Sequence, residues 1–119
     1  MKTKQVKKLL RKYTRWWIHW LGLGYWTVDI VFKKRKDRCP ESDTVCGVCE
    51  CDWKYLTAII TFYTEPMKNK TAYKIERAVV HELMHVFLHE MRWEGIEHEE
   101  RVATQLQHAF TWVKGAHHA

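Results

Sequence analysis

Five residues in the second half of the chain, His81-Glu82-Leu83-Met84-His85, have the types and the spacing of a metal site. Residues four apart on an α-helix lie one above the other on nearly the same face, so the imidazoles of His81 and His85 can bind one ion. Glu82 points about 100° away around the helix axis, beside such an ion. There it can take a proton from a water whose pKa zinc lowers to about 7. The pattern therefore predicts a zinc site with Glu82 as general base, rather than two solvated histidines.

A catalytic zinc ion needs a third protein ligand, and the acidic segment 97–100 offers the candidates. At about 100° per residue, Glu99 falls in the middle of the apolar face of the helix that follows. That face is formed by Val102, Ala103, Leu106, Phe110 and Val113. A carboxylate at the centre of a packed face is costly unless something positive meets it. We therefore favour Glu99 as the third ligand and keep Glu100 and His98, on its two flanks, as alternatives.

The hydrophobic periodicity predicts the elements that must position these side chains. Helical spacing of apolar residues covers residues 3–21, 71–91 and 97–114, and alternation typical of strands covers 25–32 and 53–63. Residues 33–50 are charged and rich in cysteine, which indicates a loop. This order predicts an α+β fold: an N-terminal helix, a small antiparallel sheet of two or three strands with a cysteine-bearing loop, the motif helix and a C-terminal helix.

Length and composition limit the class of protein. A chain of 119 residues without repeats or linkers is expected to be one domain, residues 1–119. The 46% hydrophobic and 29% charged fractions are those of a globular protein and exclude a disordered or collagen-like chain. We see neither an apolar run of about 20 residues nor a secretory signal. We therefore expect a cytoplasmic protein with no membrane partner.

The formal net charge of +6 comes largely from basic residues within segments 2–15 and 33–38. Such clusters attract nucleic acid or acidic surfaces, and they also keep small proteins soluble. Nucleic acid is therefore a possible partner beside a peptide or protein substrate.

All four cysteines, Cys39, Cys46, Cys49 and Cys51, lie within thirteen residues. In a reducing compartment this clustering favours a second, structural zinc ion bound by the four thiolates. Disulfides and plain thiols are the alternatives.

His81-Glu82-x-x-His85, followed by a helix that opens with Glu99-x-x-Val102, resembles the arrangement of gluzincin metallopeptidases. The short chain is similar to minimal zincin-like domains such as the ImmA/IrrE-type proteases and small phage-encoded metallopeptidases. The resemblance covers roughly residues 53–113. It implies a zincin-like fold in which the strand segment Ala58–Phe62 forms the edge along which a substrate peptide lies.

Two functions remain open at this point. The first is a zinc-dependent peptidase in which His81, His85 and Glu99 bind Zn²⁺ and Glu82 activates water. A peptidase similar to the SprT-like DNA-associated proteases, with His98 as the third ligand, is an alternative form of this function. The second is a non-catalytic, zinc-stabilised module that binds nucleic acid or protein. Glu82 distinguishes the peptidase from the binding module, because a purely structural zinc site does not require a carboxylate beside the ion.

Overall fold

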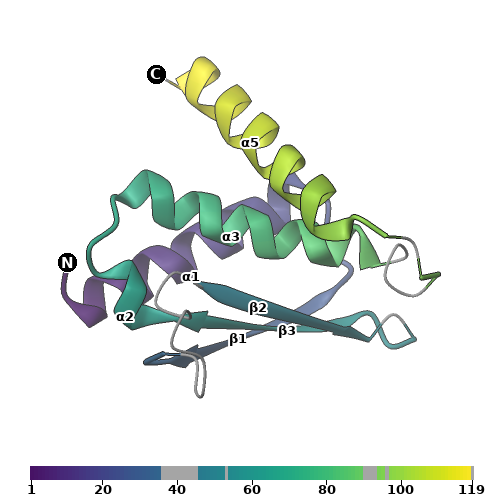
Figure 1. The fold of residues 1–119 in the computed structure, drawn as a ribbon, viewed down its shortest axis with the longest axis horizontal. Helices are drawn as coiled ribbons and strands as arrows, with labels where there is room; N and C mark the ends of the chain where they lie inside the picture. The colour runs from purple at the N-terminus through teal and green to yellow at the C-terminus, as the bar shows by residue number, and fades with distance from the viewer. Residues whose placement is uncertain (36–45, 53, 90–93, 96, 119) are drawn as a thin grey trace.

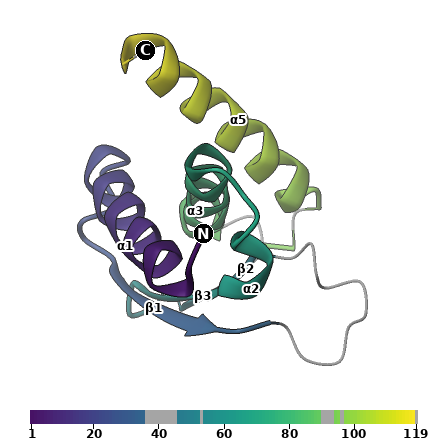
Figure 2. The same cartoon turned by 90° about the vertical axis from the view of Figure 1, so that its left-hand side faces the viewer.

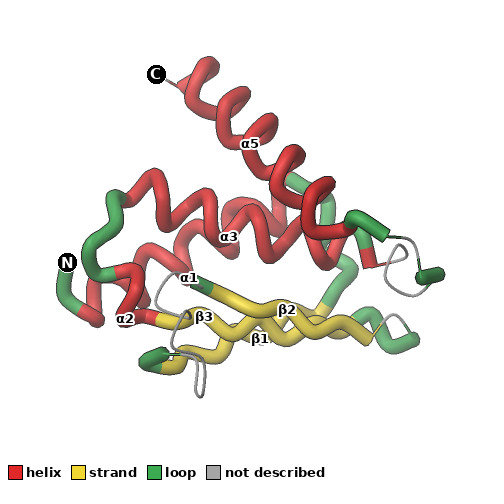
Figure 3. The backbone as a smooth tube through the Cα atoms, viewed as in Figure 1, coloured by secondary structure: helices red, strands yellow, loops and turns green. Residues whose placement is uncertain are grey.

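The computed structural model describes residues 1–35, 46–52, 54–89, 94–95 and 97–118. Its elements in chain order are α1 (Thr3–Trp20), β1 (Thr27–Lys33), β2 (Gly47–Asp52), β3 (Thr57–Tyr63), α2 (Thr64–Met67), α3 (Ala72–Phe87) and α5 (Glu99–His118). Figure 3 shows helices and strands along one trace, and the predicted α+β class is confirmed. Across these residues we find no helix with the length and apolar character that a membrane crossing requires.

The sheet has three strands in the order β1-β3-β2, and it is mixed rather than antiparallel as predicted. β1 pairs with β3 in parallel, with Ile30 opposite Ile60, whereas β2 pairs with β3 antiparallel, with Cys49 opposite Ile60. The physical reason is the path of the chain: β2 runs back along the sheet, so β3 starts at the same end as β1 and inserts between its two neighbours. The expectation that Ala58–Phe62 forms an edge is therefore wrong, since β3 is central and β2 is an edge.

The helices lie over one face of this sheet. α1 and α3 lie side by side above the strands, and α5 lies on the far side of α3 (Figures 1 and 2). Alternation along β3 directs Ala58, Ile60 and Phe62 toward the helices, where all three are buried, and leaves Ile59 exposed on the other face. The helix that carries the sequence motif, α3, thus packs its apolar side into the core between the sheet and the helices.

Local signals explain where the helices begin and end. Gly22 has φ 69°, the left-handed conformation that ends many helices. Its amide donates to the carbonyl of His19, and the amide of Leu23 donates to that of Ile18, which together satisfy the last turn of α1 as in a Schellman motif. α3 begins after Thr71, whose side chain accepts a hydrogen bond from the amide of Lys74.

One buried carboxylate joins three helices. Glu76 of α3 is 7% exposed, and Trp17 of α1 donates its indole N–H to Glu76 Oε2 at 2.8 Å. Lys114 of α5 forms an ion pair with the same oxygen. Its ammonium also lies 4.2 Å from the ring centroid of Trp16. We call this set of residues the three-helix junction; it fixes α5 at a point far from its first turn.

Candidate metal centre

α3 places the motif residues between the sheet and α5. Its fully buried residues Ile75, Val79 and Leu83 follow one another at four-residue steps, which anchors that face in the core. His81 and His85 come from a neighbouring face, one helical turn apart, and their ring centroids are 5.0 Å from each other. The predicted approach of the two imidazoles is therefore present.

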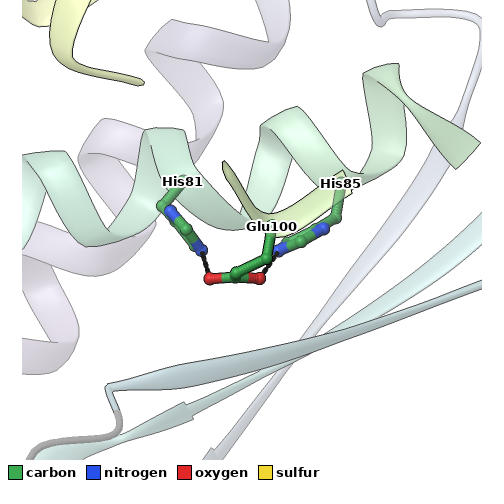
Figure 4. A group of neighbouring side chains, drawn as sticks. All are labelled: His81, His85 and Glu100. Carbon is green, nitrogen blue, oxygen red and sulfur yellow. Dashed lines mark ion pairs between the residues drawn. The ribbon is translucent and has the colours of Figure 1, made fainter. Parts of the chain in front are cut away.

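Glu100, in the first turn of α5, reaches both imidazoles at once. Figure 4 shows its carboxylate between the two rings. Its Oε1 lies 2.7 Å from His81 Nε2, and its Oε2 lies 3.0 Å from His85 Nε2. Among the described residues, His81, His85 and Glu100 are the only three His, Cys, Asp or Glu side chains whose ligand atoms all lie within 4.8 Å of one another. Two imidazole nitrogens and one carboxylate oxygen form the donor set of a catalytic zinc site with an open fourth position.

Glu99 lies against the other side of the same histidine. His85 Nδ1 donates to Glu99 Oε2 at 2.5 Å, and the Glu99 side chain is only 11% exposed. A carboxylate on Nδ1 holds the proton there and leaves Nε2 with the lone pair that a metal needs. Sequence reasoning placed Glu99 on the inward face of the helix and favoured it as a ligand; the structure brings Glu100 to the Nε2 atoms and Glu99 to Nδ1.

His98, the other candidate ligand, lies outside this group. Its side chain is 60% exposed and its Nε2 is 3.9 Å from Glu97 Oε2. Its carbonyl accepts the hydrogen bond from the amide of Val102 that opens α5. The ring thus has no part in the convergence of His81, His85 and Glu100 in the structure.

Glu82 is buried, with 6% of its surface exposed, and it lines the wall beside the two histidines. Gly47, the first residue of β2, lies directly against it: a Cβ on Gly47 would be 3.0 Å from Glu82 Cγ and 3.2 Å from the carbonyl oxygen of Thr61. A cleft of about 390 Å³ at this place is bordered by β2, by the motif residues and by Glu99 and Glu100. Glu82 therefore borders the space next to the ligand atoms, the position that the role of a base predicted from the sequence would require.

Burial lowers the pKa of His81 below its ordinary value of 6.5, and the neighbouring His85 lowers it further, while Glu100 acts in the opposite direction. A lowered pKa keeps the imidazole neutral to a more acidic pH. Because only the neutral ring binds a metal, this environment suits a ligand.

The predicted cysteine site is described only in part, since Cys39 lies outside the described residues. Cys49 and Cys51 point to the same side of β2, with their sulfur atoms 3.6 Å apart, and burial raises the pKa of the Cys46 thiol. Within the described part of the chain, these thiols do not enter a group of three possible metal ligands. The second zinc ion stays a prediction.

Sequence reasoning missed four residues of a second cleft, of about 570 Å³, that shares His81, Glu82 and Glu100 with the metal centre. They are Lys70, Lys74, Arg77 and Gln107. The first three recur at steps of four and three residues toward His81, so the same helical spacing that revealed the histidines could have found them.

The chain was also compared with known proteins. No family model, curated protein or solved structure matches it. In the candidate metal centre, two imidazoles and a carboxylate converge on one point, with a second carboxylate behind one imidazole and a third beside the cleft.

Proposed function

We propose that this protein is a zinc-dependent peptidase. The observation that carries the proposal is the convergence of His81 Nε2, His85 Nε2 and a Glu100 oxygen from two different helices. Three such ligands leave a fourth position for water or substrate, which distinguishes a catalytic zinc site from a closed structural one. The side chain of Glu100 is 72% exposed, so the site opens to solvent.

Each neighbouring residue has a role in this proposal. His81, His85 and Glu100 would hold the ion, and Glu99 would orient His85 through Nδ1. When bound, zinc supplies a Lewis acid that polarises the peptide carbonyl and lowers the pKa of water to about 7. Glu82 would accept the proton of the attacking water and then pass it to the departing amine, so the carboxylate is restored at the end of the cycle.

The position of Glu82 suits it to this role, because the side chain is buried in the wall of the cleft beside the ligand atoms. Gly47 lets β2 approach within contact of Glu82, which confines the carboxylate to the side of the cleft. Its placement beside the ligand group, rather than within it, favours a catalytic function over a purely structural zinc site.

The test compares the wild-type protein with Glu82→Gln. Both proteins should contain one zinc ion at this site by elemental analysis, and only the wild type should cleave a proteome-derived peptide library, read by mass spectrometry. Glu50→Gln, at an exposed position of β2, is the matched control and should cleave like the wild type. Equal cleavage by wild type and Glu82→Gln would show that Glu82 is not the base. Zinc without any cleavage would favour the zinc-stabilised binding module.

A further inference from the structure

This inference rests on the proposed function and concerns what the enzyme cuts. The cleft of about 570 Å³ adjoins the candidate metal centre, because His81, Glu82 and Glu100 border both this cleft and the cleft of about 390 Å³ at the histidines. Whatever lies in this cleft is therefore next to the bond that is cleaved. The chemistry of its remaining wall decides which side chain fits there.

That wall is basic. Lys70 and Lys74, and Arg77 one turn further along α3, line it. In the described part of the chain, none of the three forms an ion pair with a carboxylate. The guanidinium of Arg77 lies 2.9 Å from a ring nitrogen of His108 and 5.7 Å from the ring centroid of Tyr73. Since a bound zinc ion would offset the charges of Glu82 and Glu100, the cleft of the loaded enzyme would be positively charged.

The position of these cations is unfavourable for the helix itself. The first turn of α3 contains no acidic residue, and Lys74 is its third residue, where the positive end of the helix dipole favours a carboxylate. A cation there costs stability, and departures from such local rules concentrate at functional sites. The helix N-terminus adds its own partial positive charge to that of the three side chains.

Buried hydrogen-bond donors complete the wall. Gln107 of α5 is 6% exposed, and among the described residues its Nε2 has no hydrogen-bond acceptor. The same holds for Arg77 Nε. A buried donor without an acceptor costs about 1–3 kcal/mol. Gln107 and Arg77 both border the cleft beside Lys70 and Lys74, which form no ion pair within the described residues, so an anionic acceptor suits this place.

The geometry points to an acidic side chain of the peptide substrate, Asp or Glu, next to the scissile bond as the occupant of this cleft. A single carboxylate supplies both the negative charge and the acceptor oxygens that the wall lacks. Lys70, Lys74 and Arg77 are the only cationic side chains among the described residues that border the cleft, and three cations at one wall suit a single carboxylate better than the row of phosphates of a nucleic acid. The enzyme thus selects substrates with an acidic residue at one position beside the cleaved bond.

The test measures binding, so that it does not depend on turnover. Peptide hydroxamates chelate zinc and carry a chosen residue beside the chelating group; two series, with the hydroxamate at either end, cover both sides of the scissile bond. We expect the zinc-loaded wild type to bind the Glu probe about tenfold more tightly than the Gln probe in one series. The double variant Lys70→Ala/Lys74→Ala should lose this preference, and Lys74→Glu should shift it toward a Lys probe.

The matched control is Lys8→Ala/Lys12→Ala, which removes the same charge at the same spacing from exposed positions of α1 and should keep the preference. Thermal unfolding of each variant verifies that it is folded.

Tight binding of both probes without a preference would overturn the inference and leave the zinc site intact. Absence of zinc and of probe binding would overturn the proposed function and the inference with it. A Lys70/Lys74-dependent affinity for a short single-stranded oligonucleotide, with no Glu preference, would assign the cleft to nucleic acid and overturn the inference.

Discussion

The two neighbouring carboxylates of α5 provide the sharpest test of the metal centre. Glu99→Gln and Glu100→Gln each remove one charge from the first turn of the same helix. The loss of favourable interaction with the helix dipole, about 0.3–1 kcal/mol, is therefore similar in both variants. Any large difference between them must come from their contacts with the histidines and the ion.

The expected magnitudes follow from these contacts. Four-ligand structural zinc sites have apparent binding free energies of about 10–16 kcal/mol, or roughly 2.5–4 kcal/mol per ligand, so Glu100→Gln should weaken zinc binding about 10²–10³-fold. Glu99→Gln changes only the partner of His85 Nδ1, and loss of such a partner costs about 10–100-fold. Without zinc the order is reversed: Glu100 is 72% exposed and its replacement costs little beyond the helix-dipole interaction of about 0.3–1 kcal/mol, whereas Glu99 is 11% exposed and also loses a buried charged hydrogen bond.

The assay is a competition titration of zinc against a fluorescent chelator at one neutral pH, combined with urea unfolding of the zinc-free proteins. A larger loss of zinc affinity in Glu99→Gln than in Glu100→Gln would refute the assignment from geometry and restore Glu99 as the ligand. Unchanged affinity in both variants would refute the metal centre itself.

Three further predictions concern residues around the site. Gly47→Ala places a methyl group 3.0 Å from Glu82 Cγ, so kcat/KM for a cleaved peptide should fall about tenfold or more at unchanged zinc content; an unchanged kcat/KM would contradict the role of that contact. Lys74→Glu puts a carboxylate three residues after the capping residue Thr71 and should raise the free energy of unfolding by about 0.5–1 kcal/mol in urea titrations, where a lower midpoint would count against the argument. Because the folded protein holds the pKa of His81 below 6.5, the unfolded chain binds more protons between the folded pKa and about 6.5. The thermal midpoint of the zinc-free protein should therefore fall as the pH drops across this window, and His81→Gln should show a weaker dependence.

The sequence was most informative where spacing alone sets geometry. A four-residue step brought His81 and His85 together, and the glycine pattern predicted the end of α1 close to its observed last residue, Trp20. β2 was missed because its residues, Gly-Val-Cys-Glu-Cys-Asp, include few with high β-propensity. The parallel pairing of β1 with β3 was also missed, since alternation indicates a strand without fixing its direction or its neighbours.

The third ligand shows the limit of the same reasoning. Helical periodicity separated an inward Glu99 from a flanking Glu100, and the exposed fractions of 11% and 72% agree with that separation. It favoured Glu99 as the ligand, but which of the two carboxylates reaches the Nε2 atoms depends on how α5 is tilted against α3. A histidine ring has two nitrogen atoms, and neighbouring carboxylates on a second helix can reach one each.

The three-helix junction also constrains the tilt of α5 against α3. A rise of 1.5 Å per residue separates Glu100 from Lys114 by about 21 Å, so α5 is a rigid rod attached to α3 near both ends. A displacement of about 1 Å at the Lys114 end that pivots the rod would turn it by about 3°. Where α5 couples its two ends, thermodynamic reciprocity makes the effect mutual: a change that loosens the remote attachment weakens cation binding at the proposed centre, and cation binding there tightens the remote attachment by an equal free energy.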